Sequence, residues 1–306
     1  MPLTPMMQQY QTLKSAHPDC ILMCRLGDFY EMFFEDALTA SKALGITLTG
    51  KACGLEERAP MCGVPHHALE SYLTKLVGSG YKVAICDQVE DPKHAKGLVK
   101  REITRIVSAG TNINIQSLDE TKNNYICCIA YFEENSGLAF IDITTGDFHL
   151  TEAKDTRKIL DEITKYAPSE IVSNDTFILS GIDLSDLKDR QGIRVSTLES
   201  RFFTDENSHR ALKDHFRADN LKALSLTDYP IGTIAAGALL SHLYDTQKTS
   251  LNHIQTIDPY HSGAYMLLDA ATRRNLELTE TLREKQKKGS LLWVLDKTKT
   301  AMGART

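Results

Sequence analysis

The chain has no long hydrophobic run and no secretory leader. Its 306 residues contain no apolar stretch near the ~20 residues that a membrane-spanning helix needs. The N-terminus lacks a basic start followed by an apolar core, so no cleaved secretory signal is expected. Hydrophobic residues make up 42% and charged residues 25%, which is typical of a soluble globular protein with two to three domains and favours a cytoplasmic location.

Paired metal-ligand motifs and a disulfide framework are also missing. The seven cysteines are odd in number and scattered along the chain, so we expect reduced thiols. Cys53, Cys62, His66 and His67 could form a metal cluster, but no Cys-x2-Cys or His-x3-His pair accompanies them. The sequence therefore favours buried free cysteines, and we expect no metal site.

Strong positive charge, the usual mark of a nucleic-acid-binding chain, is absent. The net charge is −5, and residues 1–115 hold 12 Lys plus Arg against 12 Asp plus Glu. One basic cluster does stand out, and it comprises Lys93, Lys96, Lys100, Arg101 and Arg105. Together with Lys51 it could contact phosphates, which adds affinity that depends on salt and not on sequence. The alternative is a solvated basic face.

Hydrophobic periodicity divides the chain into three structured parts. Residues 1–115 alternate helical and strand patterns, which predicts a small mixed α/β domain. A polar, unpatterned linker follows at 116–124. Residues 125–260 begin with strands, including a hairpin around a Thr-Gly turn, and then alternate helices with strands, which predicts a second α/β domain with a central sheet. The pattern of residues 261–306 is purely helical.

The most distinctive local pattern is Gly27-Asp28-Phe29-Tyr30-Glu31-Met32-Phe33. It follows an apolar run at 20–26 that predicts a strand, and it opens a helical pattern that ends near Gly45. We therefore expect Asp28 to be the N-cap of a helix over 29–44, with Phe29 and Glu31 in its exposed first turn. An aromatic ring two residues from a carboxylate suits a flat partner with a hydrogen-bonding edge, such as a nucleobase. The alternative is that the aromatic side chains pack into a core.

Five collinear segments carry a resemblance to a known family. They are the motif at 27–33, TPMMQQY at 4–10, PMCGVPHH at 60–67, VAICDQVEDP at 83–92 and RIVSAGT at 105–111. In this order they resemble the mismatch-recognition domain of the bacterial MutS family of DNA mismatch-repair proteins. The resemblance implies that 125–260 is the family's connector domain, with a ribonuclease H-like fold, and that 261–306 begins its all-α core domain. One departure is Ala109, where the family commonly has proline before Gly-Thr.

The resemblance also implies roles for single residues. In the family, the Phe of a Phe-x-Glu motif inserts from the minor groove and stacks on a mispaired or unpaired base, while the Glu hydrogen-bonds that base. These roles fall on Phe29 and Glu31. Supporting DNA contacts are expected from Leu26, Lys51, Arg101 and Arg105. The implied partners are mismatched duplex DNA and, through the connector domain, MutL, and the full-length family protein is expected to be a nucleoid-associated homodimer.

The family's ATPase needs a Gly-x4-Gly-Lys-[Ser/Thr] phosphate loop, and this string does not occur in the chain. We therefore expect a fragment of a larger protein, with no catalytic residues and no cofactor of its own. ATP and Mg belong to the full-length family protein, which the resemblance implies is a DNA-dependent ATPase.

Two other functions stay open for residues 125–260. A ribonuclease H-like fold can host a nuclease that binds two metal ions between carboxylates, and the candidates are Asp142, Asp147 and Glu152. Asp142 and Asp147 also bracket a tight turn, where aspartate is common for structural reasons. The other alternative is a protein-interaction module without chemistry of its own.

Overall fold

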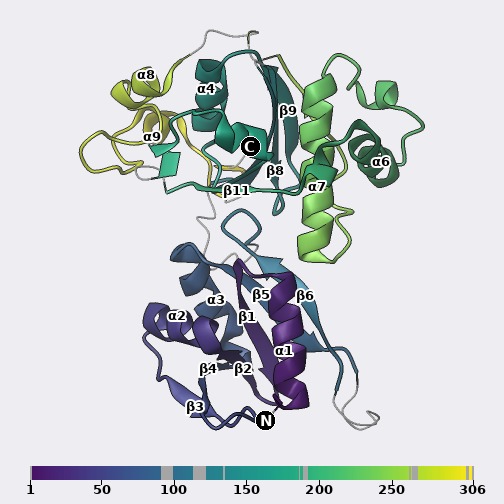
Figure 1. Cartoon of the computed structure of the whole chain (residues 1–306). Helices are drawn as coiled ribbons and strands as arrows, with labels where there is room; N and C mark the ends of the chain where they lie inside the picture. Colours follow the sequence, from purple (N-terminus) through teal and green to yellow (C-terminus); the bar gives the residue numbers. More distant parts are fainter. Residues whose placement is uncertain are drawn as a thin grey trace. The chain divides into compact units, whose positions relative to one another are not determined.

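The structure, a computed structural model, describes residues 2–90, 99–112, 122–133, 135–185, 187–188, 192–261, 263, 268–300 and 303–304. The chain forms two compact units (Figure 1). The first comprises Met1–Asn114 with Leu243–Thr249, and the second comprises Ile115–His242 with Ser250–Thr306. Two units do not delimit three domains, so the boundaries expected at 115, 124 and 260 stay a prediction. Most of the expected linker at 116–124 lies outside the described residues.

The first unit is built on a six-stranded mixed sheet in the order β3-β4-β2-β1-β5-β6. Only the central pair β1 and β5 is parallel, and every other neighbouring pair is antiparallel. The elements are α1 (Pro5–Ala16), β1 (Cys20–Leu26), β2 (Phe29–Phe33), α2 (Phe34–Leu44), β3 (Thr49–Lys51), β4 (Ala59–Pro65), the 3-10 helix η1 (His66–Ala68), α3 (Leu69–Gly78), β5 (Lys82–Gln88) and β6 (Arg101–Val107).

Helices cover this sheet on both faces, and each face has its own core. On one face α1 packs against alternate residues of the central strands through Met7 and Tyr10 (Figure 1). On the other face α2 and α3 pack against the intervening residues through side chains such as Ala40 and Leu76. We call these the α1 face and the α2/α3 face. Since strand side chains alternate between faces, the side each residue takes follows from its register.

The expected helix over 29–44, with Asp28 as its N-cap, is wrong in its first turn. Phe29–Phe33 form strand β2, and α2 begins only at Phe34, whose φ of 53° marks the corner. β2 pairs with both β1 and β4, so its backbone hydrogen bonds are satisfied across the sheet. Aromatic residues favour strands, and the link at Gly27 suits a two-residue hairpin because glycine adopts the positive φ of 61° without steric cost.

The second unit contains another six-stranded mixed sheet, in the order β11-β10-β7-β8-β9-β12. Its elements are β7 (Tyr125–Phe132), β8 (Asn135–Asp142), β9 (Phe148–Ala153), α4 (Thr156–Tyr166), β10 (Glu170–Ser173), α5 (Asp175–Leu179), β11 (Arg194–Thr197), the 3-10 helix η4 (Ser200–Phe203), α6 (Asp205–Phe216), the 3-10 helix η5 (Leu221–Leu224), α7 (Pro230–Gln247), β12 (Asp258–Pro259), α8 (Ala270–Asn275) and α9 (Leu291–Leu295).

Helices lie on both faces of this sheet as well. α4 and α5 pack on one face through Ile159, Ile163 and Phe177. α7 approaches β8 so closely that a Cβ on Gly137 would lie 2.1 Å from the Ile231 carbonyl oxygen. The α/β class expected for the chain is confirmed, with helices α8 and α9 following the second sheet. Within the described residues, no helix is both long enough and apolar enough to span a membrane.

Candidate nucleic-acid interface

The hairpin between β1 and β2 presents the candidate aromatic side chain. Leu26 and Phe29 are directly paired, so Gly27 and Asp28 form a two-residue turn. The Asp28 carbonyl accepts a hydrogen bond from the His66 backbone N–H at 2.8 Å and, in the tautomer protonated there, another from the His66 Nδ1 at 3.2 Å. Phe29 is 46% exposed. Its backbone is therefore held on two sides while its ring stays open to solvent.

Glu31 lies on the same face of β2 as Phe29, because the two residues are separated by one position. This is the α1 face, since the next residue in the alternation, Phe33, is fully buried in the core beneath α1. The structure thus brings Phe29 and Glu31 together, although on a strand and not on the helical turn expected from the sequence. One residue, Tyr30, separates them along the strand, so they are adjacent on that face.

Lys51 neutralises Glu31. Its Nζ lies 2.5 Å from Glu31 Oε2 and 5.5 Å from the centre of the Phe33 ring. The Glu31 side chain is 15% exposed and that of Lys51 35%, so the pair is only partly open to water. Gly63 is directly opposite Glu31 on β4, and a Cβ there would lie 3.4 Å from Glu31 Cγ and 3.3 Å from the Tyr30 carbonyl oxygen. A glycine at this position therefore leaves the Glu31 side chain uncrowded.

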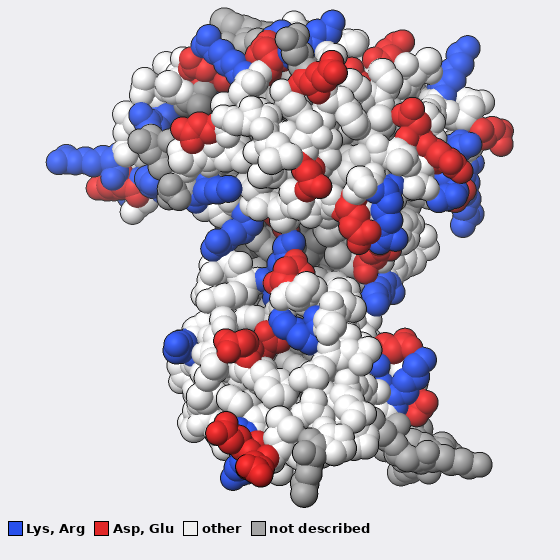
Figure 2. Space-filling view, viewed as in Figure 1, with Lys and Arg blue, Asp and Glu red and all other residues white. Residues whose placement is uncertain are grey.

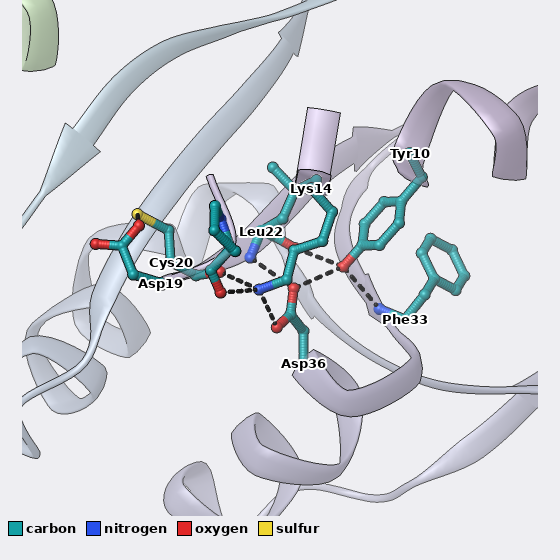
Figure 3. Close-up of polar contacts among 8 residues, drawn as sticks. Tyr10, Lys14, Asp19, Cys20, Leu22, Phe33 and Asp36 are labelled. Atoms are coloured by element: carbon teal, nitrogen blue, oxygen red, sulfur yellow. Dashed lines mark hydrogen bonds and ion pairs between the residues drawn. The ribbon is translucent and has the colours of Figure 1, made fainter. Parts of the chain in front are cut away.

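A buried polar network supports β2 from the α1 side (Figure 3). The Tyr10 hydroxyl donates to Asp36 Oδ2 at 3.0 Å and accepts from the Phe33 backbone N–H at 3.2 Å. Asp36 Oδ2 also accepts from the Leu22 N–H at 3.0 Å, and Lys14 Nζ lies 2.8 Å from Asp36 Oδ1. Burial, followed by the charge of Asp36, holds the pKa of Tyr10 far above its usual range. The network thus ties α1, β1, β2 and α2 together at the end of β2 away from the turn at Gly27 and Asp28.

This network is a part of the site that the sequence reasoning missed. Tyr10 and Lys14 are four residues apart and share a helix face, and Asp36 is an acid in the first turn of the next helix. Those positions could have suggested a contact. Nothing local, however, indicates that one carboxylate accepts from three residues of two elements, α1 and β1.

A second carboxylate anchors the opposite face of β2. The Tyr30 hydroxyl donates to Asp87 Oδ1 at 2.6 Å, and the Thr104 hydroxyl donates to Asp87 Oδ2 at 2.6 Å. Burial and then the hydrogen bond to Asp87 raise the pKa of Tyr30 to about 12. Tyr30 therefore stays protonated at neutral pH and keeps this link between β2 and β5.

Leu26 and Arg101 lie near the hairpin, and of the two only Leu26 has a partly exposed side chain. Leu26 packs partly buried beside the α1-face core. Arg101 is 8% exposed, and its guanidinium donates to the Arg25 carbonyl and to the Gln9 side chain, both at 3.1 Å. These bonds hold the start of β6 to the end of β1 and to α1. Arg101 is thus placed to support the hairpin from within the unit.

Arg105 lies on the other face of the sheet. It is directly paired with Ile85, whose side chain belongs to the α2/α3-face core, and its Nη2 forms an ion pair with Glu70 Oε1 at 2.8 Å. A register shift between Ile85 and Cys86 changes the alternation, so Arg101 and Arg105 do not share a face. The structure therefore does not bring Arg105 together with Phe29 and Glu31.

The expected basic cluster is dispersed where the structure describes it. Lys100 pairs with Glu102 at 2.6 Å, while Lys93 and Lys96 lie outside the described residues. Figure 2 shows basic and acidic side chains interspersed over the visible face, without a large area of one sign. This agrees with equal numbers of basic and acidic residues in 1–115.

Two of the three carboxylates proposed for a nuclease, Asp142 and Glu152, are engaged with the protein itself, while Asp147 is exposed. Asp142 is fully buried and accepts hydrogen bonds from the Asn124 and Thr144 N–H groups at 2.9 and 2.8 Å. Glu152 Oε1 accepts from the Ile231 and Gly232 N–H groups at the start of α7, at 2.6 and 2.9 Å. No group of three or more His, Cys, Asp or Glu side chains suited to a metal ion occurs in the described part of the chain. These contacts favour structural roles.

Comparison with known proteins identifies the family. The models for MutS domain I, MutS domain II and MutS domain III match residues 4–116, 124–255 and 271–306. A DNA mismatch repair protein MutS from Lachnoclostridium phytofermentans is 63% identical over 303 residues, which are 99% of this chain and 32% of the relative. MutS proteins from Ruminiclostridium cellulolyticum and Acetivibrio thermocellus are 55% and 54% identical, again over 99% of this chain and 35% of each relative.

The chain thus spans about a third of the length of the curated relatives it matches. The hairpin that exposes Phe29 lies in the part matched by domain I, and the engaged carboxylates Asp142 and Glu152 lie in the part matched by domain II. The chain belongs to the MutS family of DNA mismatch-repair proteins, and it carries domain I, domain II and the start of domain III.

Proposed function

We propose that this chain recognises mismatched or unpaired bases in duplex DNA. Phe29 inserts from the minor groove and stacks on such a base, while Glu31 hydrogen-bonds the same base. One observation carries the proposal: in a MutS domain I, a half-exposed phenylalanine stands at a rigid hairpin with a carboxylate two residues away on the same face. A ring held by paired strands on both sides enters a base step without losing backbone freedom.

The selectivity follows from the cost of opening the base stack. Wedging an apolar ring between base steps unstacks them and kinks the duplex, at a cost of a few kcal/mol. A mismatched site is already poorly stacked and easily deformed, so this cost is lowest at the lesion. The nearly neutral charge of residues 1–115 helps, because weak general attraction to phosphates leaves matched duplex weakly bound.

In this proposal the Lys51 ammonium group has one partner in the free chain and another in the DNA complex. In the free chain its ammonium group compensates Glu31, so the carboxylate does not stand as an isolated charge on a partly buried surface. When DNA arrives, phosphate oxygens compete for the same ammonium group. Lys51 then turns to the backbone, and Glu31 is released to accept from a base edge. Leu26 supplies apolar contact beside Phe29, and Arg101 acts by supporting the hairpin from behind.

Replacing the carboxylate should separate affinity from selectivity. Glu31→Ala is expected to raise or spare the affinity for matched duplex, because Lys51 becomes free to meet phosphate and the repulsion of a carboxylate is removed. Discrimination should fall by about 1.5–3 kcal/mol, the worth of a hydrogen bond to a charged group, which is roughly 10- to 150-fold. The measurement is fluorescence anisotropy of the variant with matched and mismatched duplexes.

Lys51→Met is the matched control for Glu31→Ala, since it keeps the aliphatic stem and leaves Glu31 uncompensated. It should weaken binding to both duplexes. Equal weakening of matched and mismatched binding by Glu31→Ala would contradict the role given to that carboxylate.

The direct test of the proposed function is a titration of this chain at low salt. One duplex is fully matched, and the other is identical except for one mismatch or one unpaired base. Tighter binding to the second duplex is expected, with an advantage that persists as salt is raised while both affinities fall. Equal binding to the two duplexes at every salt concentration would refute the proposal.

The proposal extends to the longer protein of which the relatives are examples. There, domain I serves a homodimeric, ATP-dependent DNA clamp that acts on chromosomal DNA in the cytoplasm and recruits MutL through the connector domain. ATP and Mg act in that longer protein, and this chain contributes the recognition step.

A further inference from the structure

Two cysteines meet inside the first unit at a place that the proposed function does not use. Cys24 on β1 and Cys86 on β5 are directly paired in the parallel register of the two central strands. Their Sγ atoms are 3.3 Å apart, and the residues are 2% and 0% exposed. Both side chains point to the α1 face, where they belong to the same core.

The backbone around this pair already has the spacing that a disulfide needs. Adjacent strands lie about 4.8 Å apart, and the Cα atoms of disulfide-linked cysteines are usually about 4.4–6.8 Å apart. With the sulfur atoms in contact, closing the bond takes side-chain rotation and no strand displacement. We propose that Cys24 and Cys86 are an oxidation site, at which a peroxide converts the two thiols into an intramolecular disulfide.

Cys24 is the attacking sulfur. Its pKa is lowered, first by the Sγ–Sγ contact with Cys86 and also by the positive charge of Arg101. The Cys86 pKa is raised by the same contact and by burial, so Cys86 retains its proton in the first step. The charge of Arg101 is fixed near the pair by the hydrogen bonds to Gln9 and Arg25 described above. A thiolate is the nucleophile in both thiol oxidation and disulfide formation.

The reaction balances with one peroxide molecule. The Cys24 thiolate attacks a peroxide oxygen, an S–O bond forms as the O–O bond breaks, and hydroxide leaves and takes up a proton to become water. The Cys86 sulfur then attacks the Cys24 sulfenic acid, the S–S bond forms as the S–O bond breaks, and the hydroxyl leaves as water with the Cys86 proton. Two thiols are oxidised, and the peroxide is reduced to two water molecules.

Other cysteines of the chain provide internal controls. Cys127 and Cys128 are consecutive on β7 and therefore point to opposite faces of their sheet, so they cannot close onto each other there. Both are fully buried, and burial raises their pKa values. If oxidation reflected burial or denaturation alone, Cys127 and Cys128 would be oxidised to the same extent as Cys24 and Cys86.

The test is peptide mapping of this chain after exposure to hydrogen peroxide at neutral pH. Remaining thiols are alkylated in denaturant, and the digest is examined by mass spectrometry with and without dithiothreitol. The alkylated thiols should fall from seven to five per chain, with one reducible cross-link joining the Cys24 and Cys86 peptides. Circular dichroism before and after oxidation checks that the chain remains folded. Recovery of both thiols in alkylated form, or a cross-link to any other cysteine, would overturn the proposal.

Two variants assign the order of the steps. In Cys86→Ala the resolving thiol is gone, so Cys24 should accumulate as a sulfenic acid that dimedone traps. In Cys24→Ala neither the cross-link nor a dimedone adduct on Cys86 should form, while Cys128→Ala should form the cross-link as the unchanged chain does. A dimedone adduct on Cys86 in Cys24→Ala would refute the assignment of Cys24 as nucleophile. Peptide mapping of the unchanged chain decides the site even if a variant folds poorly.

Discussion

Phe29→Ala in a full-length MutS protein that carries this region is expected to abolish discrimination between mismatched and matched duplex. The ring is the group that makes an unstacked site favourable, and base–aromatic stacking contributes roughly 1–3 kcal/mol, or about 5- to 150-fold in affinity. Mismatch affinity should fall toward that of matched DNA, which should change little. Folding should survive because the ring is 46% exposed. Binding curves on both duplexes and a thermal melt measure these effects.

The controls separate loss of stacking from loss of an exposed aromatic residue. Phe132→Ala removes a phenylalanine that is 37% exposed in the second unit, and it should leave discrimination unchanged. Phe29→Trp keeps a stacking ring and should retain discrimination. If Phe29 were a core residue instead, its replacement by alanine would lower stability by about 3–5 kcal/mol. A Phe29→Ala protein that melts far below the unchanged one yet still selects a mismatch would end the assignment.

Asp36→Ala is expected to lower the stability of the first unit strongly. It leaves the Leu22 N–H without its acceptor and Lys14 without its counter-ion, and the Tyr10 hydroxyl loses one of its two acceptors while keeping the Leu22 carbonyl at 3.2 Å. Removing one partner of a buried ion pair costs about 3–5 kcal/mol. The Lys14 side chain is 28% exposed and can be partly rehydrated, so the lower end of that range applies, about 3 kcal/mol. The unfolding midpoint should fall by roughly 10 °C or more.

The matched control is Asp19→Ala, in which the lost carboxylate is 62% exposed and lies 3.5 Å from Lys82. An exposed pair of this kind contributes about 0–1 kcal/mol. The unfolding midpoints of the two variants, measured by calorimetry, should therefore differ clearly. Asp36→Ala should also weaken discrimination between duplexes at temperatures where the unit remains folded, since the same network holds the backbone of Phe33, at the far end of the strand that carries Phe29. Similar melting of the two variants would show that the buried network contributes little.

Local patterns in the sequence determined most of the elements. The apolar run at 20–26 predicted β1, and the hairpin around a Thr-Gly turn predicted β8 and β9. In these elements the residues that set the conformation are neighbours in the chain, so periodicity and turn residues suffice. The same holds for the shared face of Phe29 and Glu31. Strand side chains alternate between faces, so two residues that are two positions apart lie on one face once the strand is known.

Other features depended on contacts between distant parts of the chain. The segment FYEMF has no decisive period, and it forms a strand because β1 and β4 lie on either side of it. The strand at 20–26 was predicted from the sequence, whereas β4 was not. Arg101 and Arg105 are four residues apart and read as one basic cluster, yet a register shift places them on opposite faces, one buried and one paired with Glu70. The meetings of Glu31 with Lys51 and of Cys24 with Cys86 arise in the same way. Each joins residues on different strands, and only strand order and register, which the packing of the whole sheet decides, bring such side chains together.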